Sequence, residues 1–383
     1  MSTVVVADSP AAAPPSAPAR MLSLDAFRGL TVAGMILVNN PGTWSAIYDP
    51  LEHAAWHGWT PTDLIFPFFL FIVGVSITLA LGRRAETAGD RRALYKKIAW
   101  RTAVIFALGL FLSGFPYFQL ATIRIPGVLQ RIAVCYFFAA VIFLNTRWRA
   151  QAAITTALLL IYWALMALVP VPGFGAGNLG MEENLAAYLD RLLLGGHTWK
   201  PLYDPEGILS TIPAVATTLC GVLTGHILRS RRTPAEKTAE MFVAGVAGVV
   251  LGWAWNFWFP VNKALWTSSY VLLTAGMALQ LLALCYWLID IKGFVRWSLP
   301  FRIFGTNALA AFFLTGLFAR ALGLIKVAGA DGKPVSLQGY VFTSFFAPWA
   351  SPENASLAFA VCFVLLWLGL LSVLYRRGVF IKV

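Results

Sequence analysis

Two of the four histidines lie within the segment YDPLEHAAWHGWTPTDLIFPFFLF, residues 48–71, which leads directly into a strongly apolar run. His53 follows Glu52, and Asp63 opens the apolar run. A histidine ring titrates near neutral pH and can take a proton from a substrate, so His53 is a candidate general base. Asp63 or Glu52 would orient the ring or hold a cationic substrate. The alternative for Asp63 is an acidic residue in the first turn of a helix, where the helix dipole favours it.

A second candidate is Arg131, which lies about one and a half turns inside another apolar run. A guanidinium at membrane depth needs a partner or a water-filled cavity. Asp204, Glu206 or Asp63 would supply the carboxylate of a structural salt bridge, and the alternative is contact with an anionic ligand. Further polar residues flank apolar runs, and we expect them at the same end of the molecule: Asn39, Asn40, Arg124, Gln130, Asn262 and Lys263.

The composition indicates which elements hold these residues in place. Of 383 residues, 59% are hydrophobic and 12% are charged, whereas soluble domains carry about 25% charged residues. The sequence therefore predicts an all-α polytopic membrane protein in a lipid bilayer. The formal net charge of +12 then reflects basic cytoplasmic loops and not a nucleic-acid partner.

A membrane-spanning helix needs about 20 mostly apolar residues. By this measure we expect ten spans within a single transmembrane domain, residues 21–383. The loop after the ninth span contains an apolar piece, residues 340–350, which is too short to cross. The expected spans are residues 25–45, 63–82, 98–115, 126–145, 151–169, 208–228, 241–259, 268–289, 301–323 and 356–375.

Most of the 29 Lys and Arg residues fall in one alternate set of loops. Because basic loops stay in the cytoplasm, both termini are predicted to be cytoplasmic, and the loop of residues 46–62, which has no Lys or Arg, faces the other side. Residues 1–20 are rich in Ala and Pro and lack a signal-peptide pattern, so we expect a disordered cytoplasmic tail.

The cysteines indicate neither a disulfide framework nor a metal site, because each lies inside an apolar run. They are Cys135, Cys220, Cys285 and Cys362. We therefore expect no metal cofactor. The sequence also lacks a phosphate-binding glycine loop, an HExxH motif and a Gly-x-Ser-x-Gly elbow.

Six motifs occur in order along the chain: SLDAFRGLTVAGMILVNNPG, HAAWHGWTPTDLIFPFFLFIVG, RIPGVLQRIAVCYF, DPEGILSTIPA, PVNKALWTSSYVL and PFRIFGTNALAAFF. Together they resemble the heparan-α-glucosaminide N-acetyltransferase family, in a bacterial-type short form. The resemblance covers about residues 21–378, which is nearly the whole membrane part. Compared with the lysosomal enzyme, we expect the extra N-terminal lumenal region and first span to be missing, and hence about one span fewer.

The resemblance implies a transmembrane enzyme that moves an acetyl group from cytoplasmic acetyl-CoA to the amine of a glucosamine on the opposite side. The family's active-site histidine, in the motif HAxWxGxT, falls on His53, and the family asparagine, in M-x-x-V-N, falls on Asn39. In this reading His53 is the base and Asn39 donates a hydrogen bond to the carbonyl oxygen. His57, beside Trp56, has no equivalent in the family members compared and is interpreted as an aromatic-belt residue.

For the other site residues we assign roles from the predicted topology only. The expected substrate-binding residues are Asp63, Glu52, Asp204 and Glu206. The expected acetyl-CoA contacts are Arg28 at the cytoplasmic end, with Arg124, Arg131 and Lys263 near the acetyl end. Whether the acetyl group passes through an acetyl-histidine is left open, as is a homodimer.

We expect the chain in a bacterial inner membrane, where an aminosugar or a cell-envelope glycan takes the place of heparan sulfate as acceptor. The alternative function is an inner-membrane transporter of N-acetylglucosamine or a related sugar, with the polar cluster as its binding site. The clustering of the motifs at one membrane face favours the enzyme, since transporter sites lie near the midplane.

Overall fold

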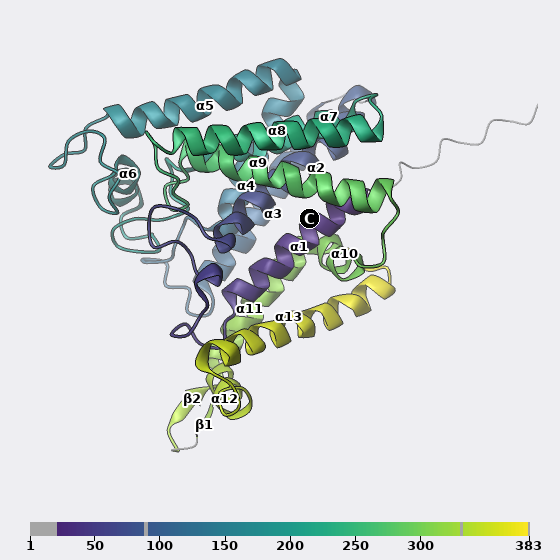
Figure 1. Cartoon of the computed structure of the whole chain (residues 1–383). Coiled ribbons are helices and arrows are strands. Elements are labelled where there is room, and N and C mark those ends of the chain that lie inside the picture. Colours follow the sequence, from purple (N-terminus) through teal and green to yellow (C-terminus); the bar gives the residue numbers. More distant parts are fainter. Residues whose placement is uncertain (1–20, 88–90, 330–331, 382–383) are drawn as a thin grey trace, which may run out of the picture.

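The computed structural model describes residues 21–87, 91–329 and 332–381. Helices make up almost all of its regular structure, and Figure 1 shows the long ones packed as one bundle. In chain order the elements are α1 (Leu22–Asn39), α2 (Ile65–Thr87), α3 (Arg92–Gly114), α4 (Val128–Asn145), α5 (Trp148–Leu168), α6 (Leu185–Leu194), α7 (Thr211–Arg229), α8 (Pro234–Trp255), α9 (Ser268–Cys285), α10 (Leu299–Thr306), α11 (Ala308–Leu324), β1 (Lys326–Ala328), β2 (Pro334–Ser336), α12 (Leu337–Phe345) and α13 (Pro352–Arg376).

Short 3₁₀ turns precede α2 at Asp49–Leu51 and Pro61–Leu64, and a π-helical turn, Tyr286–Ile291, extends α9. In the described residues, nine helical segments are long and apolar enough to cross a membrane, and the bent pair of α10 and α11 makes a tenth. The predicted all-α polytopic membrane fold is therefore confirmed. The predicted cytoplasmic tail, residues 1–20, lies outside the described residues, and the side on which the termini lie stays a prediction.

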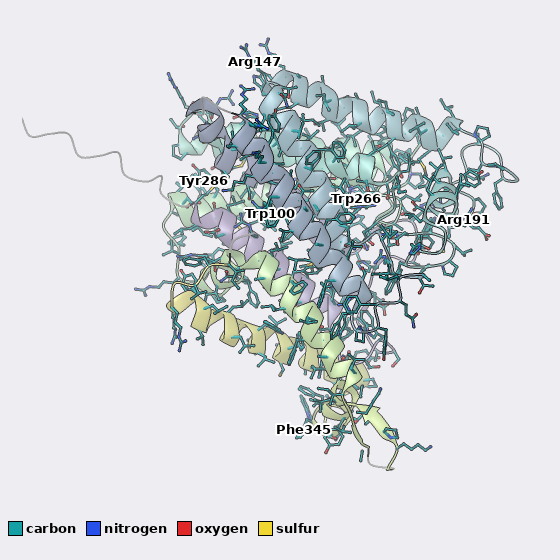
Figure 2. All side chains as sticks on the ribbon, turned by 180° about the vertical axis from the view of Figure 1, so that it is seen from behind. Trp100, Arg147, Arg191, Trp266, Tyr286 and Phe345 are labelled. Atoms are coloured by element: carbon teal, nitrogen blue, oxygen red, sulfur yellow. The ribbon has the colours of Figure 1, made fainter. Side chains whose placement is uncertain are left out.

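The outer surface of the bundle is apolar, as a lipid environment requires. Trp100 is 71% exposed on α3, whereas Trp266 is fully buried among the helices. Figure 2 labels both residues in a view from behind that of Figure 1. Large apolar side chains on the outside are stable only where hydrocarbon, and not water, surrounds them.

The expected ninth span, residues 301–323, is wrong as one continuous helix. It consists of α10 and α11, which bend by 83° where they meet at Asn307. The Asn307 amide donates to the carbonyl of Val379 (3.1 Å) and accepts from the backbone N–H of Ile381 (2.8 Å). These bonds tie the break to the C-terminal segment, a long-range contact that local hydropathy does not contain.

Helices at the centre approach one another closely. At Gly74 of α2 an added Cβ would lie 1.9 Å from the carbonyl oxygen of Thr218, and at Gly221 of α7 it would lie 1.9 Å from that of Phe71. Small residues at crossings allow this backbone contact in membrane bundles. The pair α2 and α7 thus forms a rigid centre, and the turn before α2 is attached to it.

Loops at one end of the bundle, where α1 ends and α2 begins, carry most of the polar residues of interest; we call this the His53 end. Helix α6 lies in the long loop at this end, capped by Asn184, whose side chain accepts from the N–H of Ala187 (2.8 Å). The hairpin of β1 and β2 and the short helix α12 project beyond α13 (Figure 1). Helix α12 takes up part of the apolar piece at 340–350 and, with nine residues, is too short to span.

Candidate active site

His53 and Asp63 form a hydrogen-bonded pair in the turn before α2. The Nδ1 atom of His53 lies 2.6 Å from Oδ1 of Asp63. The Asp63 side chain is 1% exposed, whereas that of His53 is 50% exposed. Because an ionised carboxylate only accepts hydrogen bonds, Nδ1 carries a proton, and in the neutral ring Nε2 therefore keeps its lone pair. The pair therefore presents a basic nitrogen that a buried carboxylate orients.

The second oxygen of Asp63 holds the backbone of the same turn. Its Oδ2 accepts from the N–H groups of Ala54 (3.1 Å) and Thr60 (3.0 Å). With Thr60 as the N-cap, Asp63 completes a capping box. The Asp63 side chain thus does both things that were expected as alternatives. It lies at the start of a helix, and it orients the His53 ring.

The turn is fixed to the rest of the bundle by two further bonds. The hydroxyl of Tyr270, which is fully buried in α9, donates to the backbone carbonyl of Asp63 (2.5 Å). The N–H of Gly58 donates to the carbonyl of Val261 (2.7 Å). Both contacts limit movement of the His53 ring relative to the membrane helices, which is what a positioned catalytic group needs.

His53 lines a cavity of about 820 Å³ at this end of the bundle. The walls come from the end of α1, the turn of His53, the loop before α7, the loop before α9, and the helices α11 and α12. Of the predicted site residues, the cavity brings together five: His53, Asn39, Arg124, Glu206 and Lys263.

Asn39 is the last residue of α1, and its side chain is exposed in this cavity. In the described part of the chain its amide makes no hydrogen bond, whereas the neighbouring Asn40 amide turns back to the carbonyl of Ile36 (2.7 Å). Asn39 therefore keeps two N–H donors for a ligand.

Arg124 forms a closed ion cluster with two carboxylates. Its guanidinium donates to both oxygens of Asp204, at 2.9 and 2.6 Å, and to Oε2 of Glu206. It also stacks over the ring of Trp199, 5.1 Å from the ring centre. Burial opposes the charged form, but the two carboxylates hold the pKa of Arg124 above its ordinary value.

Arg131 lies behind this cluster and does not reach the His53 cavity. Its Nη2 donates to the carbonyl of Gly207 and to the hydroxyl of Ser210, and its guanidinium lies 5.1 Å from the ring centre of Trp266. No carboxylate lies within salt-bridge distance of it in the described residues, so the predicted salt bridge of Arg131 is wrong. The backbone carbonyl, the hydroxyl and the indole face contact the guanidinium in place of a carboxylate, while its buried Nε and Nη1 make no hydrogen bond in the described residues.

Besides Asp63, which is buried and does not line the cavity, three other predicted residues lie apart from it. Arg28 is in the first half of α1 and donates to Asp25 (2.9 Å) and Ser76 (2.9 Å). Glu52 is exposed, and only its backbone is held: its N–H donates to the carbonyl of Asp49 (3.2 Å), and its carbonyl accepts from the hydroxyl of Thr60 (2.5 Å). Asp204 is buried beneath Arg124.

His57 differs from His53 in its partner. Its Nδ1 lies 3.3 Å from the amide nitrogen of Asn262, and its ring packs edge-on against Trp56. Burial lowers the pKa of His57 below its ordinary value. The ring has no carboxylate partner in the described residues, and its interpretation as an aromatic-belt residue stays a prediction.

Sequence reasoning missed several residues that line the cavity, among them Trp199, Lys200, Arg320 and Gln338. Arg320 could have been found, because it is an ionisable residue inside the ninth apolar run. Trp199 and Gln338 carry no such signal, since they reach the cavity from loops and from α12. The described residues contain no group of three or more His, Cys, Asp or Glu side chains placed to hold a metal ion.

The chain is similar to a known family of proteins. The family described as heparan-alpha-glucosaminide N-acetyltransferase, catalytic, matches residues 20–253, which include His53, Asn39 and Asp63. The human heparan-alpha-glucosaminide N-acetyltransferase is 30% identical over 431 aligned residues, which cover 96% of this chain and 60% of the human one. The mouse protein of the same name is 31% identical over 353 aligned residues, which cover 76% of this chain and 53% of the mouse one.

The chain thus spans between about half and three fifths of the length of these curated relatives. The match includes the turn that holds His53 and Asp63 and the end of α1 that carries Asn39. The order of the motifs, the family match and the identity to both relatives agree, and the chain belongs to the heparan-α-glucosaminide N-acetyltransferase family.

Proposed function

We propose that this protein is a membrane-embedded N-acetyltransferase that moves an acetyl group from acetyl-CoA to the amine of a glucosamine-type sugar. The observation that carries the proposal is the His53–Asp63 pair, whose ring lines a cavity together with the free amide of Asn39. The names of the human and mouse relatives support the acyl group and the sugar class. The volume of about 820 Å³ lies within the range of small-molecule sites.

His53 acts as the base in this proposal. The aminosugar reacts as the neutral amine, its ammonium having released one proton to water beforehand, and Nε2 takes a further proton from the nitrogen as it attacks the thioester carbonyl carbon. The new bond is C–N, the bond that breaks is C–S, and the proton held on Nε2 passes to the departing sulfur. Asp63 stabilises the imidazolium during this interval through its bond to Nδ1. Acetyl-CoA supplies the activated acyl group.

Asn39 stabilises the negative charge that develops on the carbonyl oxygen. Its amide is exposed in the same cavity and has no other hydrogen-bond partner in the described residues. One such donor is worth about 3–4 kcal/mol in the transition state. A direct transfer and an acetyl-histidine route both need the same free Nε2 and the same donor.

The charged lining suits both substrates. Lys263, Lys200 and Arg320 line the cavity and are suited to the anionic parts of acetyl-CoA. Glu206 lines it as well and is suited to the ammonium of an aminosugar. The basic loops support a cytoplasmic donor and an acceptor on the opposite side. We place the protein in a bacterial plasma membrane, with a cell-envelope aminosugar as acceptor.

The test is an assay of the purified full chain with labelled acetyl-CoA and a panel of aminosugars. We expect an N-acetylated glucosamine product, and we expect His53→Ala to lower kcat by about 10²–10⁴-fold, the usual contribution of a general base. His57→Ala is the matched control and should keep most of the activity. Thermal melting of each variant checks folding. Wild-type turnover by a folded His53→Ala protein would refute the assignment.

A further inference from the structure

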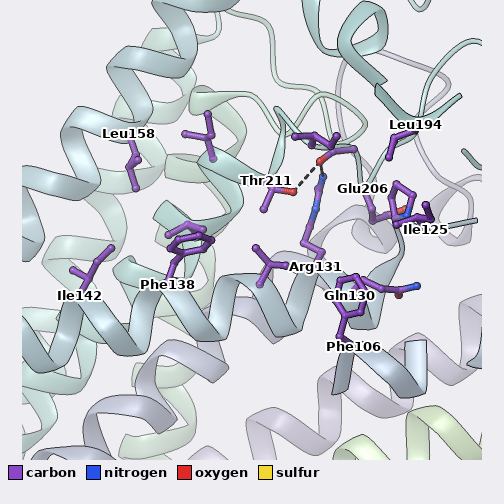
Figure 3. A pocket seen from close by; sticks show the side chains of 16 residues that line it. Phe106, Ile125, Gln130, Arg131, Phe138, Ile142, Leu158, Leu194, Glu206 and Thr211 are labelled. Carbon is purple, nitrogen blue, oxygen red and sulfur yellow. Dashed lines mark hydrogen bonds between the residues drawn. The ribbon is translucent and has the colours of Figure 1, made fainter. Parts of the chain in front are cut away.

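The His53 cavity differs from a neighbouring cavity in its aromatic lining. The neighbour, of about 530 Å³ between α4, α5 and α7 (Figure 3), is lined mainly by aliphatic side chains and two phenylalanines, and its described lining residues include no Trp or Tyr. The His53 cavity is lined by Trp44, Trp56, Trp199 and Tyr203. Their rings pair an apolar face with a polar group, so they suit a ligand that also has an apolar face and polar edges.

Trp199 is held from behind and left open in front. The guanidinium of Arg124 covers one face of its ring, 5.1 Å from the ring centre, and its backbone N–H donates to Oδ2 of the buried Asp204 (2.7 Å). The residue is nevertheless 63% exposed and lines the cavity. The other ring face is therefore available to a ligand, and a side chain fixed in this way loses little freedom on binding.

The wall that carries Trp199 adjoins the turn of His53. Trp56 belongs to this turn, and its ring packs edge-on against that of Tyr203, with 5.2 Å between the ring centres. Tyr203 precedes Asp204, which holds Trp199. In the proposed reaction the amine beside His53 is attached directly to the sugar ring, so the sugar must lie at this wall. The adenine of acetyl-CoA is separated from the thioester by the whole pantetheine arm and the pyrophosphate.

We propose that Trp199 determines the affinity for the acceptor, because its free face stacks against the C–H face of the aminosugar ring. This deepens the proposed function and rests on it. Hydrogens on carbons that also bear oxygen are partly positive, and they meet the negative face of the indole. Trp44 is 67% exposed in the same cavity, but in the described part of the chain no hydrogen bond or ring contact fixes it. It therefore offers no such preset face.

The experiment measures the Kd of glucosamine for the purified full chain by ligand-observed NMR titration, together with kcat and KM. Trp199→Leu keeps an apolar side chain but removes the ring, and we expect Kd and KM for glucosamine to rise about tenfold, as for the loss of one stacked aromatic contact. The kcat should stay within about twofold, because stacking holds ground state and transition state alike. Trp199→Phe should recover most of the affinity. Trp258→Leu, at a 71% exposed position outside the described cavity lining, is the matched control.

A wild-type Kd in Trp199→Leu overturns the proposal, whether or not the melting temperature falls, and so does a Trp199→Phe protein that binds no better than Trp199→Leu. A higher KM for acetyl-CoA alone would place adenine on the ring and overturn it too.

The NMR titration separates this proposal from the proposed function. Wild-type protein that binds glucosamine without acetylating it would count against the acetyltransferase assignment and not against Trp199, whereas absence of binding overturns the role of Trp199. If Trp199→Leu elutes as aggregate, glucosaminitol takes its place as the test. This reduced, open-chain form keeps the amine but has no ring face, so wild type should bind it about tenfold more weakly than glucosamine, and equal affinity overturns the proposal.

Discussion

Two polar clusters lie at the same end of this bundle, and they use their hydrogen bonds differently. In the pair of His53 and Asp63, the carboxylate is buried and the ring is half exposed, with one nitrogen unused. In the cluster of Arg124, Asp204 and Glu206, the guanidinium donates two hydrogen bonds, one to each oxygen of the Asp204 carboxylate. The first arrangement leaves a reactive atom in a cavity, and the second builds the wall of that cavity.

The difference shows how charged residues that catalyse a reaction can be told from charged residues that stabilise the fold of a membrane protein. A buried ion pair is expensive to desolvate and becomes unfavourable when one partner is removed. A catalytic base must keep a lone pair free, so it has a partner on one side only. Substitutions in the His53 cluster should therefore change rate more than stability, and those in the Arg124 cluster should do the reverse.

The largest effect on rate, after loss of His53 itself, is expected for Asp63→Asn. The amide oxygen would stay with the N–H groups of Ala54 and Thr60, which turns the NH₂ group toward Nδ1 of His53. The ring would then protonate on Nε2 and lose its basic atom. Loss of the correct tautomer lowers kcat by roughly 10³–10⁴-fold in other enzymes.

Steady-state kinetics measure this change, and Glu52→Gln, an exposed carboxylate in the same turn, is the control. A variant Asp63→Asn that retained its kcat would show that the carboxylate only caps the helix. A fall in melting temperature large enough to account for the lost activity would place Asp63 with the supporting cluster instead.

The largest effect on stability is expected for Arg124→Gln. It would leave the buried carboxylates of Asp204 and Glu206 without their cation, and breaking a buried pair costs about 3–5 kcal/mol. Thermal melting of the purified protein measures the loss, with Arg149→Gln as a control for charge removal. Addition of Asp204→Asn should restore part of the stability. An unchanged melting temperature would mean that the cluster does not support the wall.

Asn39→Ala comes next, with an expected loss of about 10²–10³-fold in kcat, the usual effect of removing one donor to a developing oxyanion. The KM for the sugar should change little, because the bond strengthens only in the transition state. Asn178→Ala, an exposed asparagine in a loop, controls for amide removal. A higher KM with unchanged kcat would make Asn39 a ground-state binding residue and refute its assigned role.

Much of the fold was predictable because apolar runs of membrane length carry their own signal. Nine of the ten expected spans are present as single helices. The remaining one, the ninth in chain order, bends at Asn307, whose side chain bonds to the C-terminal segment. The proximity of His53 and Asp63 was within reach because both belong to one short turn. The bonds from Arg124 to Asp204 and Glu206 were not, since they join segments 80 and 82 residues apart.

The loop before α7 was the least predictable region, because hydropathy says little about polar segments. Its helix α6 begins at Asn184 and ends before Gly195, which has a positive φ of 52°. These are ordinary start and stop signals. Capping residues therefore carry a signal for α6 that the hydropathy of the loop does not.

Asp190 in α6 yields the smallest predicted effect, and it sharpens the same comparison. Its Oδ1 accepts from the N–H of Ile208 (2.9 Å), next to the loop that holds Glu206. Burial raises the pKa of Asp190 from 3.8 to about 6. The native state therefore binds the proton more tightly than the unfolded state, and ionisation of Asp190 destabilises the fold as pH rises from about 4 to above 6, by up to about 3 kcal/mol.

Asp190→Asn keeps an oxygen acceptor for Ile208 but removes the titration. The melting temperature of the wild type should therefore fall relative to that of Asp190→Asn when the pH is raised from about 4 to about 7.5. Asp49→Asn, which removes an exposed carboxylate, is the control and should change the melting temperature by the same amount at about pH 4 and at about pH 7.5. A wild type that gains stability over Asp190→Asn with rising pH would reverse the sign, and Asp190 would then act as a paired anion like Asp204.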